Sequence, residues 1–288
     1  MKVLVTGAAG QLGRALARDI PDGVQVVALA RAELDLLHSA AIADCLQSVR
    51  PAVLINAAAY TAVDQAEAEP ERAHAVNAEA VGLLATACEE QRIRFVHVST
   101  DFVFDGASGR PYRPTDHAAP LSVYGASKLE GEQRIASHGS LDWCVVRTAW
   151  VYASTGRNFL LTMLRLFNER DVVRVVADQV GSPTSAGSLA HCVWRIATSD
   201  AAHGILHFTD AGVASWYDFA VAIYEEARGL GLISKPVHIQ PIRTTDYPTP
   251  ARRPSYSVLD VSATSALLGL QPAHWRARLR EVLQELRS

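Results

Sequence analysis

The feature that most constrains the fold is a glycine-rich turn near the start of the chain. Residues 3–13 read Val-Leu-Val-Thr-Gly-Ala-Ala-Gly-Gln-Leu-Gly, so Gly7, Gly10 and Gly13 follow an apolar run at a regular spacing. The first glycine permits a tight turn, the second lets the backbone approach a pyrophosphate, and the third lets a helix pack closely on a strand. Because free N–H groups at a helix N-terminus attract phosphates, the turn predicts a dinucleotide site.

Short apolar runs alternate with helix-like stretches through the first half of the chain. Such alternation is typical of stacked βαβ units around a parallel sheet. The runs are almost continuously apolar, as expected for strands that helices cover on both faces. We therefore predict an α/β fold with a Rossmann-type doubly wound parallel sheet. Its strands are expected at Lys2–Val5, Gln25–Leu29, Ala52–Asn56, Arg94–Val98 and Trp143–Thr148, with helices near residues 11–20, 39–49, 70–91 and 121–137.

The pattern changes after about residue 150, where turn-rich segments interrupt shorter helices. From Arg243 to the end the chain has seven Arg and four acidic residues, a local net charge of +3 within a chain of net charge −3. We predict a dinucleotide-binding Rossmann domain over residues 1–150, to which later segments return. Residues 151–288 are expected to form mainly a smaller C-terminal substrate-binding lobe, with a cleft between the two.

Charge and hydropathy exclude several classes of protein. The 27 basic and 30 acidic residues nearly balance, so no nucleic-acid partner is expected. No run approaches the ~18–20 uncharged apolar residues that cross a bilayer, and the first turn comes too early for a signal peptide. The four cysteines are far apart and form no metal-like cluster. These features predict a cytoplasmic protein without a membrane partner.

The end of the second predicted strand bears on the choice of nicotinamide cofactor. NAD-type sites carry an acid there, which binds the ribose 2′-OH, whereas this chain has Ala30 followed by Arg31. Arg31 can meet a 2′-phosphate, which favours NADPH with NADH as the alternative; an ordinary solvated arginine is equally compatible with the sequence. Asp35 and Leu36 are placed to bracket the adenine.

A tyrosine and a lysine stand four residues apart in Tyr124-Gly125-Ala126-Ser127-Lys128. On a helix this spacing puts Tyr124 and Lys128 on one face. A cation beside the phenol is expected to lower its pKa from about 10, so that it exchanges protons near neutral pH. The alternative interpretation is an exposed helical pair without chemistry.

A hydroxyl follows the fourth predicted strand at Thr100. Ligands bind at the carboxyl ends of parallel strands, so Thr100 is placed to hydrogen-bond a substrate carbonyl, although it also suits a turn cap. Glycine turn, Thr100, Tyr124 and Lys128 together predict hydride transfer, in which Tyr124 supplies the proton and Lys128 adjusts Tyr124 and holds the nicotinamide ribose. His97, in the same strand, is interpreted as a structural strand residue.

Longer motifs occur nearly from end to end of the chain. The most specific of them are Asn56-Ala57-Ala58-Ala59-Tyr60-Thr61-Ala62-Val63-Asp64, Asp178-Gln179-Val180-Gly181-Ser182-Pro183-Thr184 and Tyr247-Pro248-Thr249-Pro250-Ala251-Arg252-Arg253-Pro254. Others are Ser99-Thr100-Asp101-Phe102-Val103-Phe104-Asp105-Gly106 and Arg147-Thr148-Ala149-Trp150-Val151-Tyr152. Through these motifs the chain resembles the dTDP-4-dehydrorhamnose reductase family of the extended short-chain dehydrogenase/reductase superfamily.

The resemblance implies NAD(P)H-dependent reduction of the C4 ketone of dTDP-4-dehydro-β-L-rhamnose, the last step of dTDP-L-rhamnose synthesis. It implies that Thr100, Tyr124 and Lys128 are catalytic and that Asp101 and Trp150 face the sugar. Residues expected to line the cofactor are Gly10, Gln11, Leu12, Asp35, Leu36, Ala58, Ala59 and Tyr60. Arg252 or Arg253 is expected to bind the diphosphate of the nucleotide sugar, unless both are surface residues.

Some members of the resembled family are described as Mg²⁺-linked dimers, with a bridging acid in the first helix. This chain has Ala15 at that place, and its ten histidines form no pair with ligand-like spacing. We therefore predict no metal, and leave monomer and homodimer open.

Two alternatives remain at this stage. One is a nucleotide-sugar epimerase or dehydratase of the same superfamily. Dehydratases usually pair two acids beside the tyrosine, whereas Asp101 has no adjacent Glu. The other is a non-catalytic dinucleotide-binding regulatory subunit, against which the intact Tyr124 and Lys128 argue, since mere binding needs no adjusted phenol.

Overall fold

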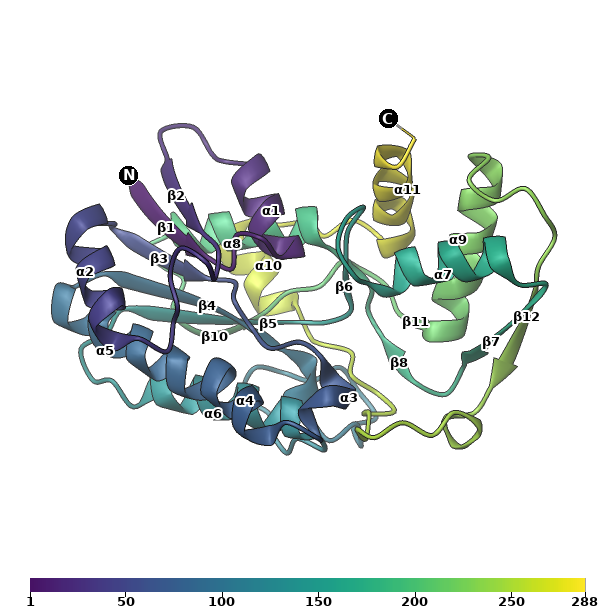
Figure 1. Cartoon of the computed structure of the whole chain (residues 1–288), viewed down its shortest axis with the longest axis horizontal. Coiled ribbons are helices and arrows are strands. Elements are labelled where there is room, and N and C mark those ends of the chain that lie inside the picture. Colours follow the sequence, from purple (N-terminus) through teal and green to yellow (C-terminus); the bar gives the residue numbers. More distant parts are fainter. Residues whose placement is uncertain (288) are drawn as a thin grey trace.

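A six-stranded parallel sheet forms the centre of the larger lobe in the computed structural model, which describes residues 1–287 (Figure 1). The strand order is β10-β5-β4-β3-β1-β2, so the order reverses between β1 and β3, the place where doubly wound sheets bind ligands. The fold class predicted from the sequence is confirmed. The strands are β1 (Lys2–Thr6), β2 (Gln25–Leu29), β3 (Val53–Asn56), β4 (Arg94–Thr100), β5 (Trp143–Thr148) and β10 (Gly204–His207).

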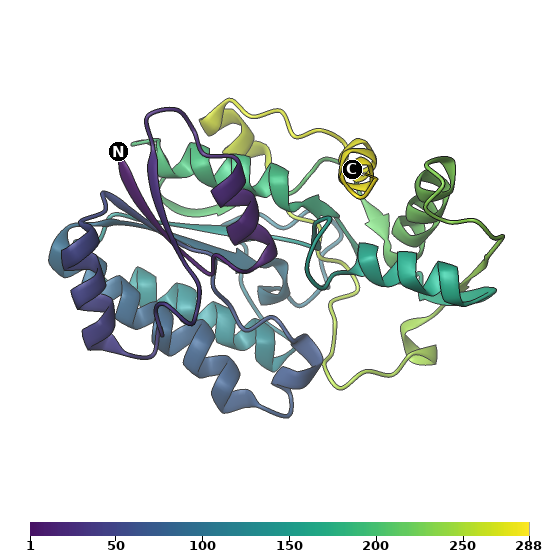
Figure 2. The same ribbon diagram turned by 45° about the horizontal axis from the view of Figure 1, so that its top comes forward.

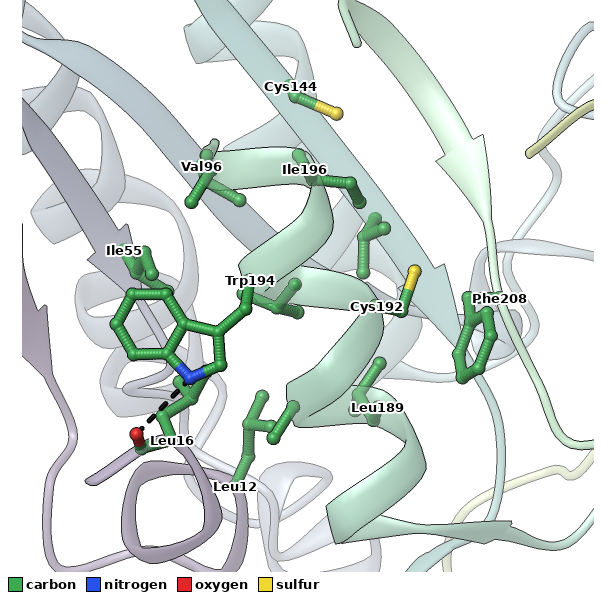
Figure 3. Packing of buried hydrophobic residues seen from close by; sticks show 14 of the residues in the cluster. Leu12, Leu16, Ile55, Val96, Cys144, Leu189, Cys192, Trp194, Ile196 and Phe208 are labelled. Atoms are coloured by element: carbon green, nitrogen blue, oxygen red, sulfur yellow. Dashed lines mark hydrogen bonds between the residues drawn. The ribbon is translucent and has the colours of Figure 1, made fainter. Parts of the chain in front are cut away.

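Helices cover both faces of this sheet (Figures 1 and 2). The first face carries α1 (Gln11–Arg18), α8 (Ala186–Ala197) and α10 (Ser262–Leu268). Trp194 of α8 lies in this apolar layer and donates its indole N–H to the Leu16 carbonyl of α1 at 3.2 Å, as Figure 3 shows. The opposite face carries α2 (Ser39–Val49), α5 (Ala80–Gln91) and α6 (Val123–Ala136).

The helix predicted over residues 70–91 contains a wide turn. It consists of α4 (Pro70–His74), a π-helical turn η1 (Ala75–Glu79) and α5. Pro70 begins it at the first turn, where the missing N–H costs little. An expectation of one uninterrupted α-helix was therefore wrong at Ala75–Glu79. Such π-bulges occur frequently at functional sites, and this one turns the Asn77 side chain toward Tyr60.

The smaller lobe is built on its own apolar core of aliphatic and aromatic side chains, which includes Phe167 and Phe219. Its helices are α7 (Phe159–Glu169), α9 (Trp216–Gly229) and α11 (Trp275–Glu285). Its short strands pair as β7 (Val172–Val176) with β12 (His238–Ile242), and β8 (Val180–Gly181) with β11 (Ala214–Ser215). Across the described residues 1–287, no helix combines the length and apolar character needed to span a bilayer.

Segments after residue 150 also contribute to the larger lobe. Strand β10 forms one edge of the central sheet and pairs with β5, while α8 packs on the sheet beside α1. The strand pair β6 (Val151–Tyr152) and β9 (Thr184–Ser185) lies where the chain passes between the lobes (Figure 1). The domain boundary at residue 150 stays a prediction.

A buried ion pair joins α6 to the sheet. Glu132 and Arg147 are each 3% exposed, and Arg147 donates to both carboxylate oxygens of Glu132 at 2.6–3.1 Å. Ser99 of β4 donates its hydroxyl to the same carboxylate, and the Arg147 guanidinium lies 5.1 Å from the centre of the Phe104 ring. Removing one member of a buried pair leaves an uncompensated charge, which is far more costly than losing an exposed pair.

We therefore expect Glu132→Leu to lower the free energy of unfolding by about 3–5 kcal/mol. The exposed pair Arg165–Glu169 on α7 supplies the control, since both partners are more than half exposed. Glu169→Ala is expected to change stability by no more than about 0.5 kcal/mol. Urea unfolding of both variants measures the two effects. Equal losses in the two variants would contradict the role given to the buried pair.

Candidate active site

A cavity of about 270 Å³ opens at the carboxyl ends of β1, β2 and β3. Its position coincides with the reversal of strand order, where ligands of doubly wound sheets bind. The structure brings eight of the predicted cofactor residues together in its lining, namely Gly7, Gly10, Arg31, Asp35, Leu36, Ala58, Ala59 and Tyr60.

The glycine turn fits a dinucleotide diphosphate. Gly7 has φ +74°, and a Cβ there would lie 2.6 Å from the Ala58 nitrogen. A Cβ on Gly13 would lie 2.2 Å from the Gly7 carbonyl oxygen, so α1 can approach β1 only without it. Helix α1 also begins without a capping side chain or an acid in its first turn. Its free N–H groups are therefore left for an anion.

Two predicted cofactor residues direct their side chains elsewhere. Gln11 accepts a hydrogen bond from Asn158 at 2.7 Å and lines a second, larger cavity on the other side of α1. Leu12 packs in the core between α1 and α8. Only the backbone N–H groups of Gln11 and Leu12 remain for the diphosphate, as the geometry of a helix N-terminus permits.

Basic side chains stand at the rim of the 270 Å³ cavity. Arg31 is exposed there beside Asp35, and its contact with a 2′-phosphate stays a prediction. Arg72, which the sequence analysis did not identify, also lines the cavity, and its guanidinium lies 5.7 Å from the centre of the Tyr60 ring. The sequence gives little sign of Arg72, because it follows β3 only after an irregular segment and a short helix.

The π-helical turn positions Tyr60. Asn77 accepts the Tyr60 N–H at 2.8 Å and donates to the Tyr60 carbonyl at 3.0 Å, so its amide holds the backbone of Tyr60 in two places. Asn77 also donates to the Ser127 hydroxyl at 3.0 Å, which ties the same turn to α6. No motif in the sequence marks Asn77; only the wide turn brings it to this position.

The end of β4 and the start of α6 bring Thr100 and Tyr124 into contact. The Thr100 hydroxyl lies close enough to the Tyr124 phenol to affect its pKa, while it donates to Asp101 Oδ1 at 3.1 Å. Tyr124 packs edge-on against Phe102 with ring centres 5.7 Å apart. Thr100 also accepts the Phe102 N–H at 3.2 Å, so its alternative as a turn cap is realised, while its hydrogen bond to a substrate carbonyl stays a prediction. A Cβ on Gly125 would lie 2.2 Å from the Phe102 carbonyl oxygen, which explains why a glycine follows Tyr124.

Burial perturbs the titratable groups at this point. Desolvation raises the pKa of Tyr124 to about 12, and the nearby Thr100 hydroxyl only partly offsets it. The expectation of a lowered Tyr124 pKa was therefore wrong for the chain by itself. Desolvation also raises the pKa of Asp101 to about 6, although Asp101 accepts a hydrogen bond from Thr100.

Lys128 is fully enclosed one turn further along α6. It is 1% exposed, and its Nζ contacts the Val98 carbonyl at 2.8 Å and His97 Nε2 at 3.1 Å. Desolvation lowers its pKa to about 8, although the carboxylate of Glu132 acts in the opposite direction. The Lys128 side chain is directed to β4, away from the Tyr124 hydroxyl, so it does not lower the pKa of Tyr124.

The residues expected to bind the substrate have different surroundings. Trp150 has φ +48° and stacks on Trp216 with ring centres 3.4 Å apart. Arg253 forms a bidentate pair with Asp64, at 2.7 and 3.0 Å, which fastens the C-terminal segment to the segment after β3. Arg252 is exposed. Arg253 is therefore engaged within the protein, while the roles of Trp150 and Arg252 stay predictions.

The larger cavity measures about 630 Å³ and lies beyond α1, between α8 and α11. Ala15, Arg18 and His191 are among its lining residues. Within residues 1–287, no three His, Cys, Asp or Glu side chains gather in a way that would hold a metal ion.

Comparison with known proteins agrees with this geometry. The family model described as RmlD substrate binding domain matches residues 1–288. A dTDP-4-dehydrorhamnose reductase of Burkholderia thailandensis is 46% identical, with both chains covered in full. Among solved structures, a dTDP-4-dehydrorhamnose reductase from Clostridium acetobutylicum superposes with a TM-score of 0.93 at 37% identity, and both chains are again covered in full.

A second solved structure, of the Bacillus anthracis dTDP-4-dehydrorhamnose reductase in complex with NADP, is 34% identical with a TM-score of 0.92, and 99% of each chain is covered. The match extends over the glycine turn, the tyrosine and lysine of α6 and the C-terminal lobe alike. The chain therefore belongs to the RmlD substrate binding domain family, the family of the dTDP-4-dehydrorhamnose reductases.

Proposed function

We propose that this protein reduces the C4 ketone of dTDP-4-dehydro-β-L-rhamnose and so produces dTDP-L-rhamnose, with NADPH as the preferred hydride donor and NADH as the alternative. The observation that carries the proposal is the contact between Thr100 and Tyr124 at the carboxyl end of β4. The reductases named above, which match the chain over its whole length, support the choice of substrate.

Two side chains of the protein, Thr100 and Tyr124, act on the C4 oxygen of the ketone. When bound, the dinucleotide supplies the hydride. The Thr100 hydroxyl donates a hydrogen bond to the C4 oxygen, and the Tyr124 hydroxyl gives that oxygen its proton. A phenol with its pKa raised to about 12 stays protonated near neutral pH, which suits a group that must donate rather than accept a proton.

We place the dinucleotide in the 270 Å³ cavity. The diphosphate would meet the first turn of α1, the adenine would lie near Asp35 and Leu36, and Arg31 would pair with a 2′-phosphate. The observation that supports NADPH is the exposed guanidinium of Arg31 at the rim, next to Ala30 where NAD-type sites carry an acid. The NADP complex of the Bacillus anthracis reductase agrees with this choice.

The smaller lobe is proposed to hold the nucleotide sugar. Residues 151–288 carry most of it, and the local excess of arginine favours a diphosphate. Because Arg253 is paired with Asp64, we assign the diphosphate contact to the exposed Arg252, with Asp101 and Trp150 beside the sugar. The four cysteines are unpaired, as in a reducing compartment, so the cytoplasm stays the proposed location. Monomer and homodimer remain open.

The two alternatives differ from the reductase in a single assay. An epimerase or dehydratase keeps its dinucleotide and returns the hydride, so no net oxidation of NADPH would occur. A regulatory subunit would bind NADPH without turnover. Steady loss of NADPH absorbance with the dTDP-4-keto sugar, together with formation of dTDP-rhamnose, is expected for the reductase alone.

Replacing Tyr124 by phenylalanine tests the proton donor. We expect Tyr124→Phe to lower kcat by about 100-fold or more, the usual contribution of a positioned general acid. NADPH affinity is expected to stay unchanged, because the phenyl ring still packs on Phe102. Steady-state kinetics and NADPH fluorescence titration measure both quantities. A variant with nearly normal turnover would remove Tyr124 from the mechanism.

The selectivity for NADPH tests Arg31. We expect Arg31→Ala to weaken NADPH binding by about tenfold, the loss of one charge-assisted hydrogen bond, and to leave NADH binding nearly unchanged. Arg165→Ala, which removes an exposed arginine from α7, is the matched control and is expected to affect neither cofactor. Equal weakening of NADPH and NADH by Arg31→Ala would show that Arg31 does not contact the 2′-phosphate.

A further inference from the structure

A buried row of hydrogen bonds leads from the first strand to Lys128. Thr6, Asn56 and His97 are register partners on the adjacent strands β1, β3 and β4, and each is at most 2% exposed. Thr6 donates to Asn56 Oδ1 at 2.7 Å, Asn56 Nδ2 contacts His97 Nδ1 at 3.0 Å, and His97 Nε2 contacts Lys128 Nζ at 3.1 Å. The row ends at the lysine of the candidate site.

The backbone fixes the orientation of the Asn56 amide. The Ala58 N–H donates to Asn56 Oδ1 at 3.0 Å, and the Thr6 hydroxyl donates to the same oxygen. A rotated amide would set its NH₂ group against the Ala58 N–H. Asn56 Nδ2 is therefore the atom that faces His97, and because an amide nitrogen only donates, His97 Nδ1 must accept.

This orientation determines the tautomer of His97. A neutral imidazole carries one proton, so a ring that accepts at Nδ1 bears its hydrogen at Nε2. A doubly protonated ring would put an N–H against the Asn56 NH₂ group. Complete burial agrees, because desolvation lowers the pKa of His97 well below its usual value. The Nε2–H bond is thus directed at Lys128 Nζ.

An ammonium group cannot accept that hydrogen bond, whereas a free amine can. We propose that His97 is a positioning residue that holds Lys128 as the neutral amine in the protein without bound dinucleotide. In this form the Nζ lone pair accepts from His97 Nε2–H, and one amine hydrogen is donated to the Val98 carbonyl. The second amine hydrogen remains available to a ligand.

The charged and titratable neighbours of Lys128 are compatible with this assignment. Glu132, one turn further along α6, favours the ammonium, but its carboxylate is already engaged by Arg147 and the Ser99 hydroxyl. On the side of β4, Lys128 meets His97, which is neutral. At the start of α6 lie the protonated phenol of Tyr124 and the buried Asp101, whose own pKa is raised.

Lysine NMR of the whole chain tests the proposal directly. The sequence has three lysines, Lys2, Lys128 and Lys235, so ¹³C,¹⁵N-lysine labelling gives three side-chain signals. Lys2→Arg and Lys235→Arg assign the other two. Because the hydrogen bond from His97 adds to the effect of burial, we expect Lys128 Cε to titrate below pH 7, more than about three units under the ordinary lysine value of roughly 10.4. Titration of Lys128 at pH 8 or above would overturn the proposal.

The tautomer of His97 is a second measurement on the unaltered protein. Long-range ¹H–¹⁵N spectra distinguish a protonated Nε2 from a protonated Nδ1, and His97→Gln assigns the signal. We expect the Nε2–H form throughout neutral pH. An Nδ1–H form would overturn the proposal. Neither measurement needs substrate, so the proposed reaction and the protonation state of Lys128 succeed or fail separately.

Asn56→Asp is expected to reverse the direction of the hydrogen bonds between residue 56, His97 and Lys128, with almost no change in side-chain shape. Its carboxylate accepts from the Ala58 N–H and from His97, so the imidazole should switch to Nδ1–H and offer Nε2 as an acceptor to an ammonium. We expect the Lys128 titration to move upward by at least about one unit. In the double variant Asn56→Asp, His97→Phe, the added negative charge remains but the hydrogen bonds through residue 97 to Lys128 are lost. An equal upward shift there would assign the effect to charge and contradict the role of His97.

Discussion

The candidate site exists because three parallel strands bring their carboxyl ends to one edge of the sheet in a common register. Thr6, Asn56 and His97 lie side by side on β1, β3 and β4. The segments after β1 and β3 supply the glycine turn and much of the cavity lining, and β4 ends at Thr100. Two close approaches complete the arrangement: α1 meets β1 where only glycine fits, and α6 meets the turn after β4 at Gly125. A shift in the register of one strand would move the glycine turn and its cavity away from Thr100 and Tyr124.

Burial then decides the chemistry. The low-polarity environment raises the pKa of Tyr124 and lowers that of Lys128, so burial shifts both groups toward their neutral forms. A neutral phenol is the state required of a proton donor in a reduction. The buried Glu132–Arg147 pair serves a different purpose: it fastens α6 to the sheet, so that the face carrying Tyr124 and Lys128 stays opposite the end of β4.

The strongly patterned parts of the structure could be predicted from the sequence. The five expected strands lie within two residues of those observed, and the family resemblance and fold class are confirmed. Features that depend on contacts between distant segments could not be predicted. Strand β10 is only four residues long, the π-turn at Asn77 has no local signal, and His97 reads as an ordinary strand residue. Arg253 was expected at a ligand but pairs with Asp64, which lies far away in the sequence.

The most direct test of the account is the fate of the transferred hydrogen. The protein is supplied with dTDP-4-dehydro-β-L-rhamnose and NADPH deuterated at the reactive C4 position of the nicotinamide, in ordinary water, and the product is analysed by NMR and mass spectrometry. The account predicts dTDP-L-rhamnose with one deuterium bound to C4 of the sugar and a solvent-derived hydrogen on its new hydroxyl. A product without deuterium at that carbon, or no rhamnose at all while NADPH binds, would contradict it.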